Sequence, residues 1–447
     1  MLTRRALLRH SALAAAGACL PHWVSGRARD DALIRKDDLA FLEALARATV
    51  AAATIAPGTE TGNTVGFPLV TPGGHYPALW VRDFSMASGC GLLSAQSMRD
   101  HLRLIAKTQN GPDERRLASG AIIPPFAIAD HINFDGQPVF YPGTYDAGEH
   151  QGGEPWGVLP PVDDHYEFIH IAAQLWRTTR DATFLAERIE GRTLWERLQL
   201  ALDVPTVDDA SGMIKTDVAR RAVGFGFCDT VFLTGAMLFA SLLRYRALGE
   251  MLELRHAAGH PDPIGKYAFF QEWMAMHLAE TFGSDGWLSA ATGVGRQPDV
   301  WGTLFSLDLG VLKGKRKETA LDVVVGAFDA GSITFEGAVR HVPRDHDFSP
   351  TSAWEKTAGV PLNTYQNGAY WHVPTGWLAR ALAQRDPNRA KRVVNAMIAH
   401  FRAEDWRTHD RQGAPWECLG AKGYRQNPVY MASITMPLQS LRAKASI

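Results

Sequence analysis

Cysteine is scarce in this chain of 447 residues, which contains only four. The four are separated by long stretches, so the sequence has none of the closely spaced cysteine pairs that bind structural zinc. It also lacks the disulfide framework that holds many small secreted domains together. The sequence therefore gives no indication of a metal site.

An excess of charge of either sign is lacking as well. Lys and Arg total 46 and Asp and Glu total 47, for a formal net charge of -1. This balance gives no electrostatic argument for a nucleic acid or an anionic membrane as partner. The 46% of hydrophobic and 21% of charged residues are those of an ordinary soluble globular protein.

Residues 1–30 are predicted to be an export signal rather than part of the fold. Arg4 and Arg5 lie in a basic start, a modestly apolar stretch follows over 11–20, and a polar exit lies around 25–29. This order resembles a twin-arginine signal, and its apolar stretch is too short for a resident membrane span. A disordered basic N-terminus is the alternative. Export would make the protein periplasmic or secreted.

The remainder, 31–447, is predicted to be one all-α domain, because no linker marks a second one. Strand signals are few, and long loops rich in Gly, Pro and aromatic residues alternate with short connections. Such an alternation fits helical hairpins closed into a toroid with the long loops at one mouth. An α-solenoid is the alternative, but no repeat period is found. The amphipathic pattern predicts helices at 37–56, 84–107, 164–179, 183–202, 229–257, 263–282, 299–312, 316–329, 374–385, 388–403 and 428–443.

The stretch 75–84 carries the first candidate binding residues, Trp80, Arg82 and Asp83. Asp83 is predicted to cap a helix that begins at Phe84. The three side chains would then lie on a loop held by a rigid helix, which is a common place for a recognition group. Trp can stack on the apolar face of a sugar ring, and Arg and Asp can hydrogen-bond its hydroxyls. A capped helix with a surface ion pair is the alternative.

A glycine-bracketed turn at 223–230 delivers Asp229 to the predicted start of an apolar helix, among Phe225 and Phe227. Burial there would raise the pKa of the carboxyl and let it hold a proton near neutral pH. A helix N-terminus would lower that pKa, and a plain N-cap is the alternative role.

Two later loops supply further candidates. The run 365–377 concentrates aromatic and amide side chains, of which Gln366, Asn367 and Trp371 are the expected sugar contacts. In the loop 413–420, Glu417 has Gly and Pro on both sides, so it is not a charge on a helix surface. Glu336 is a further carboxylate without an assigned role.

Taken in order, these segments resemble the six-hairpin glycosidases: glucoamylases, trehalases and neutral or alkaline invertases. Trp-Val-Arg-Asp at 80–83 resembles their sugar-gripping loop. Asp163 and Asp164 open a hairpin that resembles the one whose first carboxylate reaches a sugar hydroxyl, although either can also cap the helix. The family's general acid would correspond to Asp229.

The same resemblance assigns the general base to Glu417, although this chain reads Glu-Cys-Leu-Gly where trehalases have Glu-x-Tyr-Asp. Asp217 is a rival acid, because invertases carry theirs in a similar Met-Ile-containing run. The resemblance implies an (α/α)6 toroid and hydrolysis of a glycosidic bond with inversion, which needs no cofactor or metal.

The predicted partner is a carbohydrate substrate. Two other functions stay open from sequence: a polysaccharide lyase on a similar toroid, and a sugar-binding protein without catalysis. A lyase would need Tyr, His and Arg side chains and a basic groove. The sugar, its linkage, the exo or endo mode and the oligomeric state are not indicated by the sequence.

Overall fold

The structure is a computed structural model that describes residues 32–261, 265–410 and 412–445. The predicted export signal at 1–30 lies outside these residues. The contacts between Cα atoms group Leu33–Ile447 into one unit, and the description below concerns that unit.

Helices dominate this unit, and most of them lie where the amphipathic pattern predicts them. The α-helices are α2 Lys36–Ala52, α3 Val81–Ser88, α4 Ala95–Thr108, α5 Asp163–Thr179, α6 Leu194–Leu202, α7 Leu238–Ala257, α8 Lys266–Phe282, α9 Val300–Asp308, α10 Gly314–Asp329, α11 Thr375–Ala383, α12 Pro387–Ala403 and α13 Ala432–Ala445. Short 3₁₀-helices are η1 Thr183–Ala186, η2 Gly226–Cys228, η3 Arg344–His346, η4 Trp406–Thr408 and η5 Ala421–Gly423.

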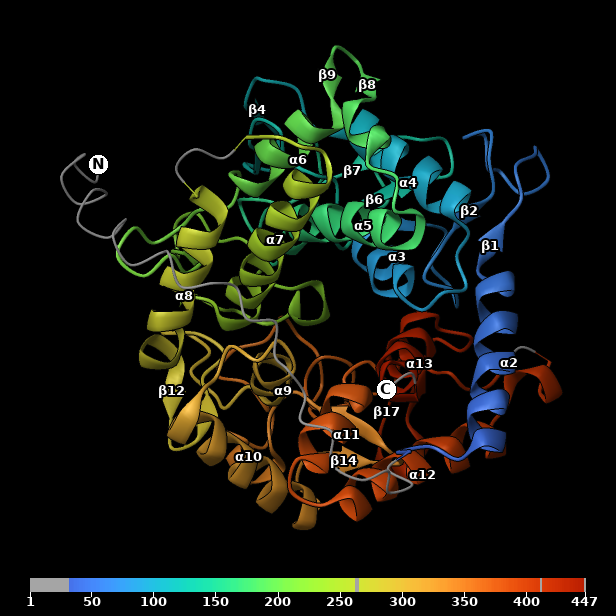
Figure 1. The fold of residues 1–447 in the computed structure, drawn as a ribbon, viewed down its shortest axis with the longest axis vertical. Helices are drawn as coiled ribbons and strands as arrows, with labels where there is room; N and C mark the ends of the chain where they lie inside the picture. Colours follow the sequence, from blue (N-terminus) through green and yellow to red (C-terminus); the bar gives the residue numbers. More distant parts are fainter. Residues whose placement is uncertain (1–31, 262–264, 411, 446–447) are drawn as a thin grey trace. The chain divides into compact units, whose positions relative to one another are not determined.

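The helices form a closed ring. α3 packs on α5, α5 on α7, α7 on α9, α9 on α11, α11 on α13, and α13 again on α3. The other helices cover this inner ring from outside, where α2 contacts α13, α4 and α6 contact α5, α8 contacts α7, and α10 and α12 contact α11. Figure 1 shows the inner helices around the centre and α8, α10 and α12 at the periphery. The predicted (α/α)6 toroid is confirmed.

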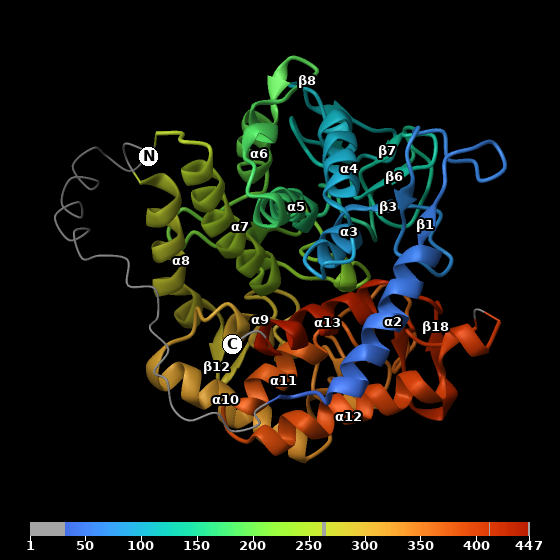
Figure 2. The same ribbon diagram turned by 45° about the vertical axis from the view of Figure 1, so that its right-hand side comes forward.

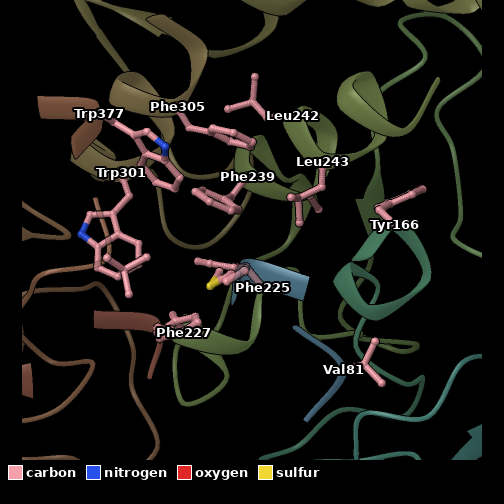
Figure 3. Packing of buried hydrophobic residues seen from close by; sticks show 14 of the residues in the cluster. Val81, Tyr166, Phe225, Phe227, Phe239, Leu242, Leu243, Trp301, Phe305 and Trp377 are labelled. Carbon is pink, nitrogen blue, oxygen red and sulfur yellow. The ribbon is translucent and has the colours of Figure 1, made fainter. Parts of the chain in front are cut away.

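Burial differs between the two rings, as this architecture requires. Every residue of α3 and nearly all of α9 are buried, whereas the outer helix α10 buries only Ala320, Leu321 and Val324. A helix that is apolar on all sides must be covered on all sides. Figure 3 shows part of the resulting core, where Phe225 stacks on Phe239 at 3.8 Å and Phe305 stacks on Trp377 at 4.9 Å between ring centroids.

The connecting segments contain short strands that hydrogen-bond one loop to another. The sequence pattern did not predict them. They are β1 Thr54–Ile55, β2 Leu69–Val70, β3 Ala78–Trp80, β4 Arg115–Arg116, β5 Ile122–Ile123, β6 His131–Asn133, β7 Pro138–Val139, β8 Arg188–Ile189, β9 Arg192–Thr193, β10 Lys215–Thr216, β11 Gly235–Ala236, β12 Gly283–Ser284, β13 Trp287–Leu288, β14 Thr334–Phe335, β15 Ala338–Arg340, β16 Tyr370–Trp371, β17 Cys418–Leu419 and β18 Arg425–Gln426. The largest sheet has the order β14-β15-β16-β17-β18, with antiparallel neighbours. Figure 2 shows the same ribbon turned by 45°, with β18 labelled at the right.

Two predicted helices are wrong in ways that matter for the site. The helix expected over 84–107 is two helices, because Gly91 adopts a left-handed φ of 74° and Ser94 caps a new helix by accepting from Ser97 N. α3 begins at Val81, so Asp83 lies in its first turn and is not its N-cap. The helix expected over 229–257 begins only at Leu238, after Gly235 with a φ of 77°.

Cys90, Cys228 and Cys418 are buried and free. Within the described residues, no helix is both long and apolar enough to cross a membrane.

Candidate active site

The candidate active site is a cavity of about 270 Å³ that is lined by three carboxyl groups, one from helix α3 and two from loop segments. Asp83, Asp229 and Glu417 line it together with Trp80, Arg82 and Gln366. Predicted site residues from four separate stretches of the sequence thus meet in one place. Aromatic residues complete the wall: Tyr76, Tyr145, Trp156, Phe227, Tyr365 and Tyr430.

Trp80 forms an aromatic corner of the cavity. It ends β3, which pairs with β6, so that Trp80 lies opposite His131. The His131 ring stacks on the indole with centroids 4.5 Å apart, while Tyr76 and Tyr145 approach it edge-on. Tyr145 is 45% exposed. The loop at 143–156 contributes Tyr145 and Trp156 to the cavity wall.

Arg82 is paired with three buried aspartates, Asp130, Asp163 and Asp164, and is not a free sugar-binding cation. These four side chains are called the hub below. Arg82 is 4% exposed, and its Nε donates to Asp163 Oδ2 at 2.8 Å. Its Nη2 donates to Asp130 Oδ1 at 2.6 Å and to Asp164 Oδ2 at 3.0 Å. Buried charges must be paired, and here the pairing consumes most of the guanidinium's donors.

Asp163 and Asp164 are therefore placed differently from the prediction. Both are fully buried in the first turn of α5 and bind Arg82, and neither lines the cavity. Asp130 also belongs to this hub, and its other oxygen lies 2.7 Å from His131 Nδ1. Nothing in the local sequence around Asp130 distinguishes it, so only the fold could identify it.

Asp83 lies beside this hub and faces the cavity. Its Oδ1 accepts a hydrogen bond from Tyr430 OH at 2.5 Å. Burial raises the pKa of Asp83 to about 6, against the opposing effects of Tyr430 and Arg82. A carboxyl that is fixed by a tyrosine and borders the cavity can accept hydrogen bonds from a ligand's hydroxyl groups.

Asp229 stands on an irregular segment, directly after η2. The side chain is half-buried at the cavity, and its Oδ1 is shielded from solvent and has no hydrogen-bond partner among the described residues. Burial raises the pKa of Asp229 to about 7, while the positive charge of Arg82 and the neighbouring amide of Gln366 oppose that rise. An unpartnered buried oxygen favours the protonated carboxyl, which carries no charge.

Glu417 precedes β17 and is 2% exposed. Its Oε1 accepts from Tyr76 OH at 2.9 Å, and its Oε2 accepts from Asn427 Nδ2. Burial raises the pKa of Glu417 to about 8, although these two bonds oppose the rise. Tyr76, Asn427 and Tyr430 were missed as site residues. Tyr76 lies within the stretch singled out from sequence, but the sequence around Asn427 and Tyr430 carries no signal for them.

The run 365–377 contributes one predicted residue to the cavity. Gln366 borders it, but its amide is bonded to Gly226 and Thr230, on either side of Asp229. Asn367 is fully buried and holds its own loop, accepting from Ala353 N at 2.8 Å and donating to Val360 O at 2.7 Å. Trp371 is fully buried in β16 and packs edge-on against Phe227, with centroids 5.2 Å apart. The predicted sugar contacts of Asn367 and Trp371 are therefore not supported, because neither lines the cavity.

The rival acid lies elsewhere. Asp217 is exposed, its Oδ1 accepts from Arg220 N at 2.8 Å, and it borders a separate cavity of about 370 Å³ beside Lys215. A general acid must reach the same sugar as the base. The geometry therefore favours Asp229 over Asp217.

One group of side chains in the described residues has the spacing of a metal site: Glu336, His400 and Glu404. Arg425 Nη2 already lies 2.8 Å from Glu336 Oε2 and 2.7 Å from Glu404 Oε1. The guanidinium is thus the cation of this cluster. Glu336, which had no predicted role, is part of an ion-pair network that does not line the cavity.

Comparison with known proteins identifies the fold. No family model and no curated protein sequence matches the chain. Among solved structures, the chain is similar to a glycoside hydrolase family 15 glucoamylase from Hypocrea jecorina, with a TM-score of 0.57 and 12% identity over 92% of this chain and 73% of that one. The fold is that of the six-hairpin (α/α)6 glycoside hydrolases.

Two other structures with this fold bear out the resemblance. A family 63 mannosylglycerate hydrolase from Thermus thermophilus has a TM-score of 0.54 and 13% identity, over 89% of this chain and 99% of that one. A family 78 rhamnosidase from Bacillus sp. GL1 has a TM-score of 0.53 and 14% identity, over 90% of this chain. The chain spans only 35% of the length of that rhamnosidase.

Proposed function

We propose that the protein is an exported glycoside hydrolase in which Asp229 is the general acid and Glu417 the general base of an inverting reaction. Asp229 would protonate the leaving oxygen, and Glu417 would activate a water on the opposite face of the sugar. The observation that carries this proposal is the contrast between two carboxyl groups on one cavity. One has a buried oxygen without a partner, and the other has both oxygens hydrogen-bonded.

Sugar recognition would rest on the groups around these two. Trp80 and Tyr145 offer aromatic surface, and Asp83 offers an oxygen acceptor fixed by Tyr430. Arg82 borders the cavity as well, but its charge is paired with Asp130, Asp163 and Asp164. Binding groups of these kinds suit the hydroxyls and apolar faces of a carbohydrate.

The charge of the cavity wall supports a neutral sugar as substrate. Arg82 is the one cation among the lining residues, and three carboxylates offset it. A uronate would bring a carboxylate next to Asp83, Asp229 and Glu417 without a free cation to neutralise it. The polysaccharide lyase alternative needs such a cation, so the cavity argues against it.

The test begins with a hydrolysis screen of oligosaccharides and glycosides, with the anomer of the first product followed by NMR to establish inversion. Asp229→Asn and Glu417→Gln are then compared on the natural linkage and on the glycosyl fluoride of the released sugar. General acid or base catalysis contributes about 10²–10⁴-fold. Asp229→Asn should lose this on the natural linkage and keep activity on the fluoride, whose leaving group needs no proton. Glu417→Gln should lose both.

Asp217→Asn is the matched control, because it removes a carboxylate from a neighbouring cavity and should keep wild-type kcat/KM. If Asp229→Asn hydrolyses the natural linkage at the wild-type rate, the two-carboxylate assignment is wrong. If ligand binding persists but no variant or wild-type protein hydrolyses any substrate, the protein is a sugar-binding protein.

Export is a separate part of the proposal, with 1–30 as signal and 31–447 as the catalytic domain. It is supported by the Arg4-Arg5 pair and the apolar stretch that follows. Replacing both arginines by lysine should retain the protein in the cytoplasm, as measured by cell fractionation. Unchanged delivery would contradict the twin-arginine assignment.

A further inference from the structure

The segment that carries Asp229 lacks the support that a helix would give. Residues 226–228 form one 3₁₀ turn, and α7 begins only at Leu238. An irregular segment has no internal ladder of hydrogen bonds, so the position of its side chains depends on contacts with other parts of the chain. A general acid must nevertheless be held to within a fraction of an ångström of its productive geometry.

Gln366 bridges the two ends of this turn. Its Nε2 donates to Gly226 O at 3.0 Å, before Asp229. Its Oε1 accepts from Thr230 N at 2.8 Å and from Thr230 Oγ1 at 2.7 Å, after Asp229. One amide thus fixes the backbone on both sides of the carboxyl-bearing residue, from a segment that is 136 to 140 residues away in sequence.

Gln366 is itself immobilised. It is fully buried, and its backbone carbonyl accepts from Trp354 Nε1 at 3.0 Å. Trp354 is 1% exposed. The amide therefore has little freedom to turn toward a ligand, and its hydrogen-bonding groups are already engaged by the turn.

Gly226 is fixed from its other side by the hub of buried charges. Its N–H donates to Asp163 Oδ2 at 2.8 Å. The backbone lies so close to Arg82 that a Cβ on Gly226 would be 2.1 Å from the guanidinium carbon. Gln366 consequently ties Thr230 to a point that the hub holds in place.

We propose that Gln366 is a positioning residue for the general acid, and not a sugar contact. The inference rests on the proposed function, in which Asp229 protonates the leaving oxygen. It assigns to Gln366 the placement of the Asp229 carboxyl relative to the scissile bond. Loss of the bridge should therefore weaken proton donation and leave water activation by Glu417 in place.

The decisive variant is Gln366→Met, which has a similar length and loses all three side-chain hydrogen bonds of the bridge. On the natural linkage, kcat should fall about 10- to 100-fold, which is the usual effect of a small displacement of a catalytic group. KM should change little. On the glycosyl fluoride, kcat/KM should stay close to that of the wild type.

Gln109→Met is the matched control. Gln109 is a buried glutamine with three side-chain hydrogen bonds of its own, to Phe126 O, Arg197 O and Arg197 Nη1, and it does not line the cavity. Gln109→Met should lose thermal stability without a change in the ratio of kcat/KM on the natural linkage to kcat/KM on the glycosyl fluoride. Thr230→Val, which removes only the hydroxyl arm, should shift that ratio in the same direction as Gln366→Met and by less. It also preserves the test if Gln366→Met fails to fold.

Three outcomes separate the inference from the proposed function. If Asp229→Asn keeps the natural-linkage activity, the proposed function fails. If Asp229→Asn is inactive but Gln366→Met and Thr230→Val leave the ratio of rates as in Gln109→Met, the positioning role is overturned and the proposed function stands. If Gln366→Met raises KM on both substrates with kcat unchanged, Gln366 contacts the sugar and the inference is also overturned.

Discussion

Asp229 and Glu417 face the same cavity but are held in opposite ways. Glu417 adjoins β17, the strand that pairs with β16 on one side and β18 on the other, and its N–H donates to Gln426 O at 3.0 Å. Asp229 belongs to no sheet or α-helix and depends on side chains from distant segments. The backbone positions one carboxyl, and buried side chains position the other.

The two carboxyls also differ in how their oxygens are satisfied. Both have a raised pKa because removal from water disfavours the charged form of each carboxyl. Glu417 has a hydrogen-bond donor for each oxygen, which supports its ionised form, whereas Asp229 leaves Oδ1 without a partner. Hydrogen bonds to the charged form favour that form. The pKa values, about 7 for Asp229 and about 8 for Glu417, do not by themselves identify the acid, so the assignment of Glu417 as the base rests on the donors bound to its two oxygens.

The largest effect is expected on the folding free energy, from Arg82→Ala in the hub that contacts the segment of Asp229. The change leaves Asp130, Asp163 and Asp164 buried without their cation. Removing one partner of a buried ion pair costs about 3–5 kcal/mol, and this hub has three such pairs. We expect loss of most of the folding free energy in urea denaturation.

Arg385→Ala is the control for this prediction, because Arg385 pairs with Glu318 and Asp322 on the surface. Such exposed pairs contribute about 0–1 kcal/mol. If Arg82→Ala is as stable as Arg385→Ala and only weakens ligand binding, Arg82 is a ligand contact and not a structural hub.

Asn427→Asp, next to the proposed base, should change the ionisation of Glu417 and not the stability of the fold. Asn427 Nδ2 donates to Glu417 Oε2, and a carboxylate in its place would accept instead and repel the base. A like charge raises the pKa of a carboxyl. The base is active only when ionised, so the acidic limb of the kcat/KM profile, which the pKa of about 8 governs in the wild type, should move to higher pH.

The expected loss of kcat/KM at neutral pH is about tenfold for each pH unit by which the limb moves. Asn363→Asp is the control, since Asn363 also adopts a left-handed φ, of 65° against 45° for Asn427, and does not line the cavity. An unchanged acidic limb in Asn427→Asp would mean that Glu417 is not the base.

A smaller effect is expected from Asp229→Asn, and it concerns stability. Burial raises the pKa of Asp229 from 3.8 to about 7. The folded state thus binds a proton more tightly than the unfolded state, and the wild type loses stability as pH rises through this window. Asparagine has no such loss, so the variant should become more stable than the wild type as pH rises.

The gain should level off above the folded-state pKa at about 1–2 kcal/mol, which is less than the full linkage value because cavity water reaches the side chain. Thermal denaturation at pH values below, within and above the window measures it. Asp217→Asn, which alters an exposed carboxylate, should show no comparable pH-dependent gain. A variant that is less stable than the wild type at every pH would contradict the raised pKa.

The sequence predicted most of the helices because hydrophobic periodicity is a local property that helices retain. The closure of these helices into a ring was expected from the alternation of short and long loops and from the family resemblance. The sequence pattern failed where glycine and an N-cap divided a continuous apolar pattern, as at Gly91 and Ser94. Two-residue strands such as β16 and β17 are too short to show an alternating pattern.

At the site, the residue types were predictable and their assignments only in part. Asp83, Asp229 and Glu417 were found because their loops are unusual in composition, and all three line the cavity. Asp163 was predicted as a sugar contact, whereas its carboxylate binds Arg82, which is 81 residues away, and no local pattern encodes that pairing. Gln366 was predicted as a sugar contact and does line the cavity, but its bonds to Gly226 and Thr230 depend on the fold.

Asn427 has a consequence for the lifetime of the protein. Asparagine side chains convert slowly to aspartate when the backbone nitrogen of the next residue attacks the side-chain amide, and this step needs an N–H. The residue after Asn427 is Pro428, whose nitrogen carries no hydrogen. The donor beside Glu417 is thus protected, by its neighbour in the chain, from the spontaneous ageing that would place a negative charge next to the base.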